Sequence, residues 1–311
     1  MELKKEVYQK YNFYTIKNKC GLEITFSDYG ASIYSIKLNN HYLTYHEEDY
    51  DAFFKSNKFS GKTLGRIAGR IKGGVLKIGS KTYHIEKNEN NNTLHGGKHC
   101  LSFQKFETSL SESEELYNIV FKYTSPANEC GFPHEVRFIV VYSMMKNENK
   151  FSIHYHANVN GLTPISMAPH IYWRLLDKDV LNHRLMINAN YVAKTDKELV
   201  ITGKEKVKKA FDFRSEKRIG VDIPITGYDH TFILNKGDKP QITLRNAGIK
   251  LSIKTDMEAT QVYTNCYPGI NKIKGYGKDI KYGGVAIEPQ MFNPTNKSKL
   301  IIKPKQGLSL T

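Results

Sequence analysis

The chain has 311 residues, of which 40% are hydrophobic and 12% aromatic, so it can bury a sizeable core and is not expected to be intrinsically disordered. Its formal net charge of +15 comes mostly from lysines spread along the chain, and we therefore expect a solvated surface and no nucleic-acid partner. The longest apolar stretch, residues 138–145, is too short to cross a bilayer and the N-terminal segment is unlike a signal peptide, so we expect a cytoplasmic protein with no membrane partner.

Short strands account for most of the pattern along the chain. Residues 76–85 predict two strands around a Gly-Ser turn, and the apolar run 138–142 predicts a third strand. Residues 151–157 alternate apolar and polar side chains, which is typical of a half-buried strand, and 251–255 and 259–263 predict two more. Turn residues recur at short intervals, and no segment shows convincing helical periodicity with capping residues.

We expect residues 1–311 to form a single all-β domain with few or no helices, because no linker, composition shift or internal repeat divides them. A β-sandwich is favoured over a barrel. The four cysteines lack the CxxC spacing of a metal or redox motif, so we expect reduced thiols. A monomer and a homodimer both remain open.

Two segments resemble ligand sites but lack required residues. The segment 60–63, Ser-Gly-Lys-Thr, matches the end of a phosphate-binding loop, but Ser56 stands where that loop needs its first glycine. His154 and His156 lie on one face of a predicted strand, but no third metal ligand follows at a suitable spacing. We therefore expect neither a bound metal nor a nucleotide cofactor.

Two histidines stand in contexts that suggest a function. His95 is followed by Gly96 and Gly97, which let the backbone come close to a ligand and leave the imidazole unobstructed. His170 lies between Pro169 and the aromatic segment 171–173, where a polar side chain is costly unless it has a partner or a task. The alternative for both is a structural histidine whose hydrogen bonds are satisfied within the protein.

Arginines and carboxylates supply the other candidates. Arg66 and Arg70 offer a rigid donor fork that the many lysines cannot mimic. Asp229 is either a turn residue or an acceptor for two ligand hydroxyl groups. Glu288 follows the apolar segment 285–287, so we expect a partly buried carboxylate with a raised pKa, which makes it a usable base near neutral pH. The alternative is that the two arginines and Glu288 are solvent-exposed charged residues without a functional role.

Five polar segments, taken in chain order, resemble those of the aldose 1-epimerases, the galactose mutarotase family. They are residues 65–71, 94–97, 169–173, 227–232 and 288–290. The resemblance covers nearly the whole chain. It implies a large antiparallel β-sandwich with the site in a cleft on one face, a small sugar as the partner, and no cofactor.

The resemblance also implies the roles of individual residues. The matching positions are His95, His170, Glu288, Arg70, Asp229 and Gln261. His170 is expected to protonate the ring oxygen of the sugar, and Glu288 to take the proton of the anomeric hydroxyl. His95 and Arg70 bind and polarise the sugar near the reacting centre, while Asp229 holds hydroxyl groups and Gln261 lies near the sugar. We therefore expect an enzyme that interconverts the α and β anomers of an aldose by general acid–base catalysis.

Four positions depart from the pattern that is usual in the family. Gly69 stands where an asparagine commonly precedes the arginine, and Pro169 and Arg174 flank the second histidine motif where asparagines are frequent. His134 replaces a small residue. These departures bear on which sugar is preferred.

Two other functions remain open from the sequence. A non-catalytic sugar-binding or regulatory protein can share this fold, because one fold hosts many functions. A glycoside hydrolase or lyase would need two carboxyl groups flanking the bond, and Asp229 with Glu288 is the only plausible pair.

Overall fold

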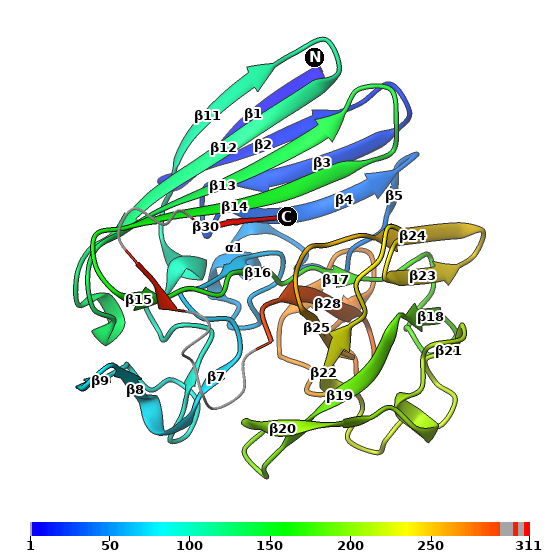
Figure 1. Ribbon diagram of the computed structural model, residues 1–311. Coiled ribbons are helices and arrows are strands. Elements are labelled where there is room, and N and C mark those ends of the chain that lie inside the picture. Colours follow the sequence, from blue (N-terminus) through cyan, green and yellow to red (C-terminus); the bar gives the residue numbers. More distant parts are fainter. Residues whose placement is uncertain (1, 293–300, 304–307) are drawn as a thin grey trace.

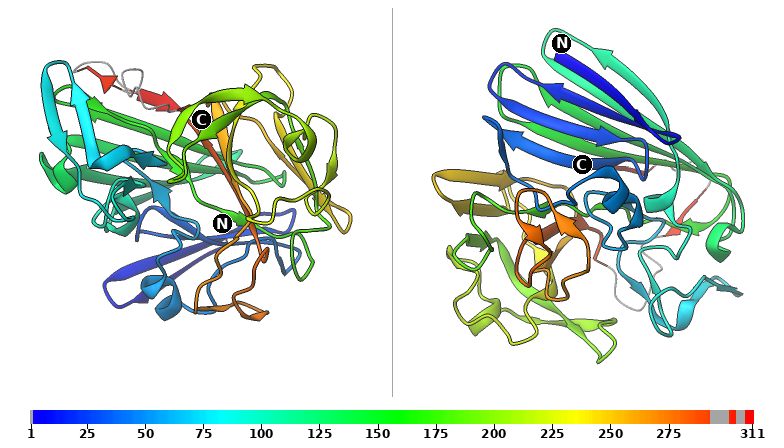
Figure 2. Two further views of the ribbon diagram at one scale, coloured as in Figure 1. Left: turned by 90° about the horizontal axis from the view of Figure 1, so that it is seen from below. Right: turned by 180° about the vertical axis from the view of Figure 1, so that it is seen from behind.

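Antiparallel β-sheets dominate the computed structural model, which describes residues 2–292, 301–303 and 308–311 (Figure 1). Two five-stranded sheets lie face to face in the upper half of Figure 1, and Figure 2 shows them from below and from behind. The first sheet contains, in order, β1 (Glu2–Tyr8), β2 (Tyr11–Lys17), β3 (Leu22–Ser27), β4 (Ser32–Leu38) and β5 (His41–Tyr42). The second contains β11 (Glu107–Glu112), β12 (Leu116–Ser125), β13 (Val136–Met145), β14 (Phe151–Val159) and β30 (Leu308–Leu310).

Alternating side chains build the core between these two sheets. In β13, Val136, Phe138 and Val140 are fully buried, while the residues between them are more exposed. Ile24 and Phe26 of β3 belong to the same hydrophobic cluster. Because every second residue of a strand points to the same face, the period of two is what allows each sheet to bury one face against the other.

A six-stranded sheet lies beneath this sandwich in Figure 1. Val262 and Ile287 of this sheet belong to the same hydrophobic cluster as the sandwich core, so the core continues into it. Side chains on alternate positions point to the opposite face, which is free to carry polar groups. The strands in order are β17 (Tyr172–Trp173), β28 (Val285–Gln290), β25 (Ala259–Tyr263), β22 (Asp229–Leu234), β19 (Ala189–Thr195) and β20 (Ile201–Lys206).

Smaller sheets complete the architecture. A four-stranded sheet contains β21 (Lys217–Arg218), β18 (Arg184–Ile187), β23 (Ile242–Asn246) and β24 (Ile249–Ile253). Five strand pairs are β6 (Thr63–Leu64) with β16 (Ala168–Pro169), β7 (Arg70–Ile71) with β10 (Thr93–Leu94), β8 (Val75–Ile78) with β9 (Lys81–His84), β15 (Thr163–Pro164) with β29 (Ile301–Ile302), and β26 (Lys272–Ile273) with β27 (Gly277–Lys278).

Helical structure is sparse, as expected from the sequence. Within the described ranges the one α-helix is α1 (Tyr50–Lys55), whose N-cap Asp49 accepts a hydrogen bond from the Ala52 amide at 2.8 Å. In the same ranges, single turns of 3₁₀-helix cover Lys72–Gly74, Leu101–Phe103, Glu129–Gly131 and Lys209–Phe211. No helix in the described part of the chain is long and apolar enough to cross a membrane.

The predicted strands are confirmed, with differences at their ends. The run 138–142 is the centre of the ten-residue strand β13, because alternate apolar residues continue on both sides of it. The strand expected at 251–255 is β24, which begins and ends two residues earlier. The four cysteines, all in described residues, are free thiols.

Candidate active site

The register of the six-stranded sheet gathers polar side chains on one face. Gln261 of β25 pairs with Glu288 of β28 on one side and with Thr231 of β22 on the other. Asp229 lies two residues before Thr231, so it points to the same face and is paired with Tyr263. Three residues expected from the sequence, Asp229, Gln261 and Glu288, therefore come from three adjacent strands of one sheet.

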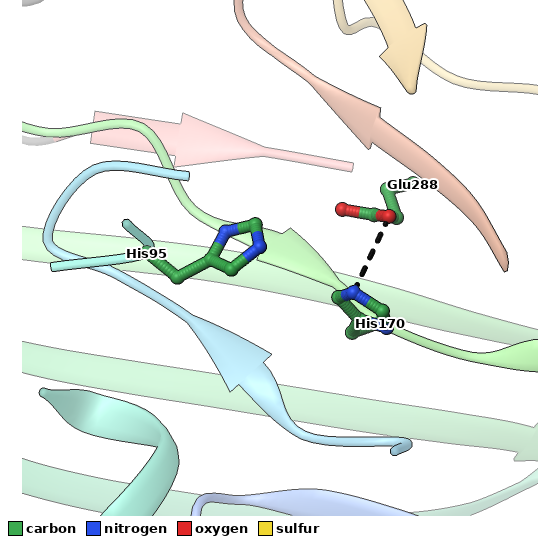
Figure 3. Close-up of side chains that lie close together, drawn as sticks. All are labelled: His95, His170 and Glu288. Atoms are coloured by element: carbon green, nitrogen blue, oxygen red, sulfur yellow. Dashed lines mark ion pairs between the residues drawn. The ribbon is translucent and has the colours of Figure 1, made fainter. Parts of the chain in front are cut away.

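His170 reaches Glu288 from the segment between β16 and β17. Its amide donates to the Lys62 carbonyl at 3.0 Å, and its carbonyl accepts from the Gly61 amide at 2.8 Å, so the backbone is fixed on both sides. The imidazole Nε2 lies 3.5 Å from Oε1 of Glu288 (Figure 3). His170 is 5% exposed and Glu288 is 1% exposed, so this contact is shielded from water.

His95 approaches the same point from the opposite side (Figure 3). It follows β10, in which Leu94 pairs with Arg70 of β7. The His95 amide donates to the Gly69 carbonyl at 3.0 Å, and the Gly69 amide donates to Nδ1 of His95 at 3.1 Å. Since Nδ1 accepts a hydrogen bond, the neutral ring carries its proton on Nε2. One nitrogen or oxygen atom from each of His95, His170 and Glu288 lies within 4.8 Å of the others.

The glycines after His95 have backbone conformations that favour glycine, and Gly96 lies close to another part of the backbone. Gly96 has φ of 96°, and a Cβ atom there would lie 2.2 Å from the Gly65 carbonyl oxygen. Gly97 has φ of 102°. The close approach at Gly96 is therefore to another protein backbone. This contact holds the His95 loop against the segment that leads to Arg70.

Burial shifts the pKa values of the three central residues in opposite directions. Burial and the charge of Asp229 raise the pKa of Glu288 well above its usual range, and the charge of Arg70 opposes them. Burial, helped by the charge of Lys58, lowers the pKa of His170 to about 4. Burial, followed by the charges of His170 and Arg70, lowers the pKa of His95 well below its usual value. Both histidines are therefore neutral at neutral pH, and the carboxyl group retains its proton more readily than it would in water.

Glu288 is more buried than the sequence suggested. The expectation was a partly buried carboxylate, and the raised pKa agrees with it, but the side chain is 2% exposed. Neither Oε2 of Glu288 nor Nδ1 of His170 has a hydrogen-bond partner among the described residues. A buried polar atom without a partner is costly, so this pair is suited to a ligand that supplies the missing hydrogen bonds.

A chain of polar contacts lies beside the cluster of His95, His170 and Glu288. Arg70 donates from Nε and Nη2 to the two carboxylate oxygens of Glu89, at 2.6 and 2.8 Å. Its Nη2 also lies 4.0 Å from Oδ2 of Asp229. Asp229 accepts a hydrogen bond from the amide of Gln261, and Gln261 accepts one from the Thr231 hydroxyl. The sequence did not point to Glu89 or Thr231, although the alternation of β22 could have placed Thr231 beside Asp229.

Aromatic rings surround the two histidines. Phe59 lies 4.9 Å from the His95 ring and 6.1 Å from the His170 ring, measured between ring centroids. Tyr172 lies 5.0 Å from His170 and 6.1 Å from Tyr263. These rings exclude water from the imidazoles, which explains why burial is the largest cause of the lowered histidine pKa values.

Arg66, the other arginine of the segment 65–71, holds neighbouring backbone in place. It is 3% exposed and donates to the hydroxyl of Ser125 and to the carbonyls of Pro126, Pro133 and His134. Its donor fork ties down the loop between β12 and β13. The contribution of His134 to this contact is its backbone carbonyl, which accepts a hydrogen bond from Arg66.

The other departures from the usual pattern lie in different surroundings. Gly69 has φ of 81°, and a Cβ atom there would meet nothing within 4 Å, so an asparagine side chain has room at this position. Arg174 is 1% exposed, packs against the rings of Tyr45 and Tyr276, and donates to the Lys178 carbonyl. Pro169 is part of β16, which pairs with β6.

The chain is similar to known proteins over most of its length. The family model described as aldose 1-epimerase matches residues 12–309. The aldose 1-epimerase of Haemophilus influenzae is 28% identical over 306 residues, which cover 92% of this chain and 88% of that protein. The galactose mutarotase of Mus musculus is 29% identical over 256 residues, covering 78% and 73%.

Solved structures share the fold. The crystal structure of galactose 1-epimerase from Lactobacillus acidophilus matches with a TM-score of 0.90 and 24% identity, covering 99% of this chain and 96% of that one. An aldose epimerase homologue from C. elegans matches with a TM-score of 0.88 and 24% identity, covering 96% and 97%. The expected mutarotase-like β-sandwich is therefore confirmed.

The backbone contact at Gly96 can be tested by measuring stability. Replacing Gly96 with alanine should lower the free energy of unfolding by about 3 kcal/mol or more, because the new methyl group strikes the Gly65 carbonyl and φ is positive. Gly79→Ala is the matched control, because φ is 59° but nothing lies within 4 Å of the added Cβ, and about 1 kcal/mol is expected. Equal losses for the two variants in urea unfolding would show that the contact is unimportant.

Proposed function

The chain belongs to the aldose 1-epimerase family, and we propose that it interconverts the α and β anomers of an aldose by means of one proton shared between His170 and Glu288. The observation that carries the proposal is the buried contact of 3.5 Å between these side chains. The substrate is a small sugar, an aldohexose or a related aldose. One hydrophobic cluster includes residues of all three large sheets, which supports the proposal that residues 1–311 form a single domain.

The reaction moves two protons and breaks one carbon–oxygen bond. Glu288 takes the proton of the anomeric hydroxyl while protonated His170 gives its proton to the ring oxygen, and the bond between C1 and the ring oxygen breaks. The product is an open-chain aldehyde beside a neutral pair of side chains. Rotation about the C1–C2 bond presents the other face of the aldehyde, and the reverse transfers close the ring as the opposite anomer.

Burial makes each group stronger in its assigned role. A histidine whose pKa is about 4 is a better proton donor, once protonated, than one in water. A glutamate whose pKa is well above the usual value is a better base once it is ionised. The charged form of the pair is costly in a buried site, but the two charges attract each other, and the sugar supplies hydrogen bonds to both. The neutral form that follows proton transfer is the one that burial favours.

The remaining polar residues orient the sugar. His95 is assigned as a hydrogen-bond donor to the reacting oxygens, since its Nδ1 is occupied by the Gly69 amide and its proton is therefore on Nε2. Arg70, Asp229 and Gln261 supply donors and acceptors on one side of the catalytic pair, a combination that suits hydroxyl groups, which both donate and accept. Fixed orientation of the substrate accounts for much of the rate enhancement in such reactions.

The two other functions that the sequence leaves open have less support. A glycoside hydrolase or lyase needs two carboxyl groups that flank the bond, whereas Asp229 is engaged by Arg70 and Gln261, and the group opposite Glu288 is His170. A protein that only binds sugar has no need of a buried acid–base pair with oppositely shifted pKa values.

Replacement of either member of the pair should affect the rate more than binding. Glu288→Gln keeps the shape of the side chain but cannot accept a proton, so kcat should fall about a hundredfold or more with little change in KM. His170→Asn should behave alike, and the double variant should lose far less than the product of the two single losses, because the two groups serve one event. Arg70→Ala and Asp229→Ala should raise KM as well.

Polarimetry and anomeric exchange NMR with a panel of aldoses measure these rates. A Glu288→Gln protein with near-normal kcat would remove Glu288 from the mechanism and favour the sugar-binding alternative.

The pH dependence should follow the number of protons on the pair. The active form of the His170–Glu288 pair carries one proton. Below a pH of about 4 His170 is protonated as well, so the pair carries two protons and has no base, and kcat/KM should fall. As the pH rises through the elevated pKa of Glu288 the only proton is lost, no acid remains, and kcat/KM should fall again. The measurement is the enzymatic rate after subtraction of spontaneous mutarotation in the same buffer. An acid limb near pH 6.5, the ordinary value for histidine, would contradict the assignment.

A further inference from the structure

Glu89 holds Arg70 in a two-point contact. Both carboxylate oxygens of Glu89 accept hydrogen bonds, one from Nε and one from Nη2 of Arg70. A paired contact of this kind fixes the plane of the guanidinium as well as its distance. Glu89 is itself held in a tight turn, since its amide donates to the Asn92 carbonyl at 3.2 Å and the Asn92 amide donates back at 2.8 Å. The orientation of Arg70 is therefore set by the loop that leads into β10.

Arg70 lies between two carboxyl groups. Its Nη2 atom is 2.8 Å from an oxygen of Glu89 and 4.0 Å from an oxygen of Asp229. Burial acts to lower the pKa of Arg70, but the hydrogen bond to Glu89 and the charges of Asp229, Glu89 and Glu288 raise it overall. Burial raises the pKa of Asp229, and the charge of Glu89 adds to this effect while Arg70 opposes it. Among the described residues, the Arg70 guanidinium thus lies beside two carboxyl groups, those of Glu89 and Asp229.

We propose that Glu89 is a positioning residue for Arg70 and that its charge makes the site select uncharged aldoses over sugars that carry a carboxylate or phosphate. The inference rests on the proposed function. An arginine fork alone binds carboxylates and phosphates well. In this protein Glu89 occupies the donor fork of Arg70, and Asp229 lies beside it. The negative charges of these two carboxylates offset the positive charge of Arg70 and repel a sugar that carries a negative charge.

The test compares two sugars in the full-length protein and its Glu89→Gln variant. Galactose and galacturonate have the same hydroxyl configuration and differ at C6, where the second sugar carries a carboxylate. In the variant, KM for galactose should rise about fivefold or more because the guanidinium is held less firmly. The ratio of kcat/KM for galacturonate to that for galactose should rise about tenfold or more because one negative charge is gone. A residue with a purely structural role would reduce both activities together.

Two further variants sharpen the result. Glu89→Asp keeps the charge but is one methylene shorter, so KM for galactose should rise while galacturonate remains excluded. Glu216→Gln is the matched control, since Glu216 is 30% exposed, compared with 29% for Glu89, and pairs with Arg184 and Arg245 outside the six-stranded sheet. It should leave both sugars unchanged.

The outcomes separate this inference from the function on which it rests. If the wild-type protein does not interconvert the anomers of any aldose, the proposed function fails. If it does, and Glu89→Gln leaves the ratio between the two sugars unchanged, the inference about Glu89 is wrong. Should Glu89→Gln fail to fold, a Glu89→Asp protein with the wild-type KM for galactose would overturn the positioning role.

Discussion

The contact between His170 and Glu288 is the interaction on which the rest of the site depends. In water these groups would be a weak acid and a weak base, but their burial lowers the pKa of one and raises that of the other. The fold supplies that burial through the aromatic rings around His170 and through the place of β28 between β17 and β25. The shifted pKa values arise mainly from desolvation, so changes in packing near the pair should act on the chemistry directly.

Backbone pairing connects His95 to Arg70, two of the residues that we propose bind the sugar. Pairing of β7 with β10 brings Arg70 beside the loop that carries His95. The Gly69 amide fixes the tautomer of His95, and Gly69 directly precedes Arg70 in the chain. One short ladder therefore sets the positions of both Arg70 and His95, and a change in the loop that contains Glu89 should affect both residues.

Much of the fold and part of the site could be predicted from the sequence. Alternating, apolar or turn-flanked segments identified strands that the structure contains, because a half-buried strand has a period that few other structures share. The apolar residues before Glu288 indicated its burial and raised pKa. The sequence could not tell Arg70 from Arg66 in physical terms, since both lie in a glycine-rich segment and only the fold shows that Arg66 is used by the loop after β12. Glu89 was missed because it contacts Arg70 from 19 residues away along the chain.

The most direct test of this acid–base pair is an NMR titration of the protein labelled with ¹⁵N in histidine and ¹³C in the glutamate carboxyl group, followed at His170 and Glu288. The His170 imidazole is expected to be neutral at pH 7 and to gain a proton only near pH 4, beside a Glu288 carboxyl group that titrates well above its usual range. A His170 that titrates near 6.5 beside a Glu288 that is ionised throughout the neutral range would contradict it, because burial would then not have prepared the pair to exchange protons with a sugar.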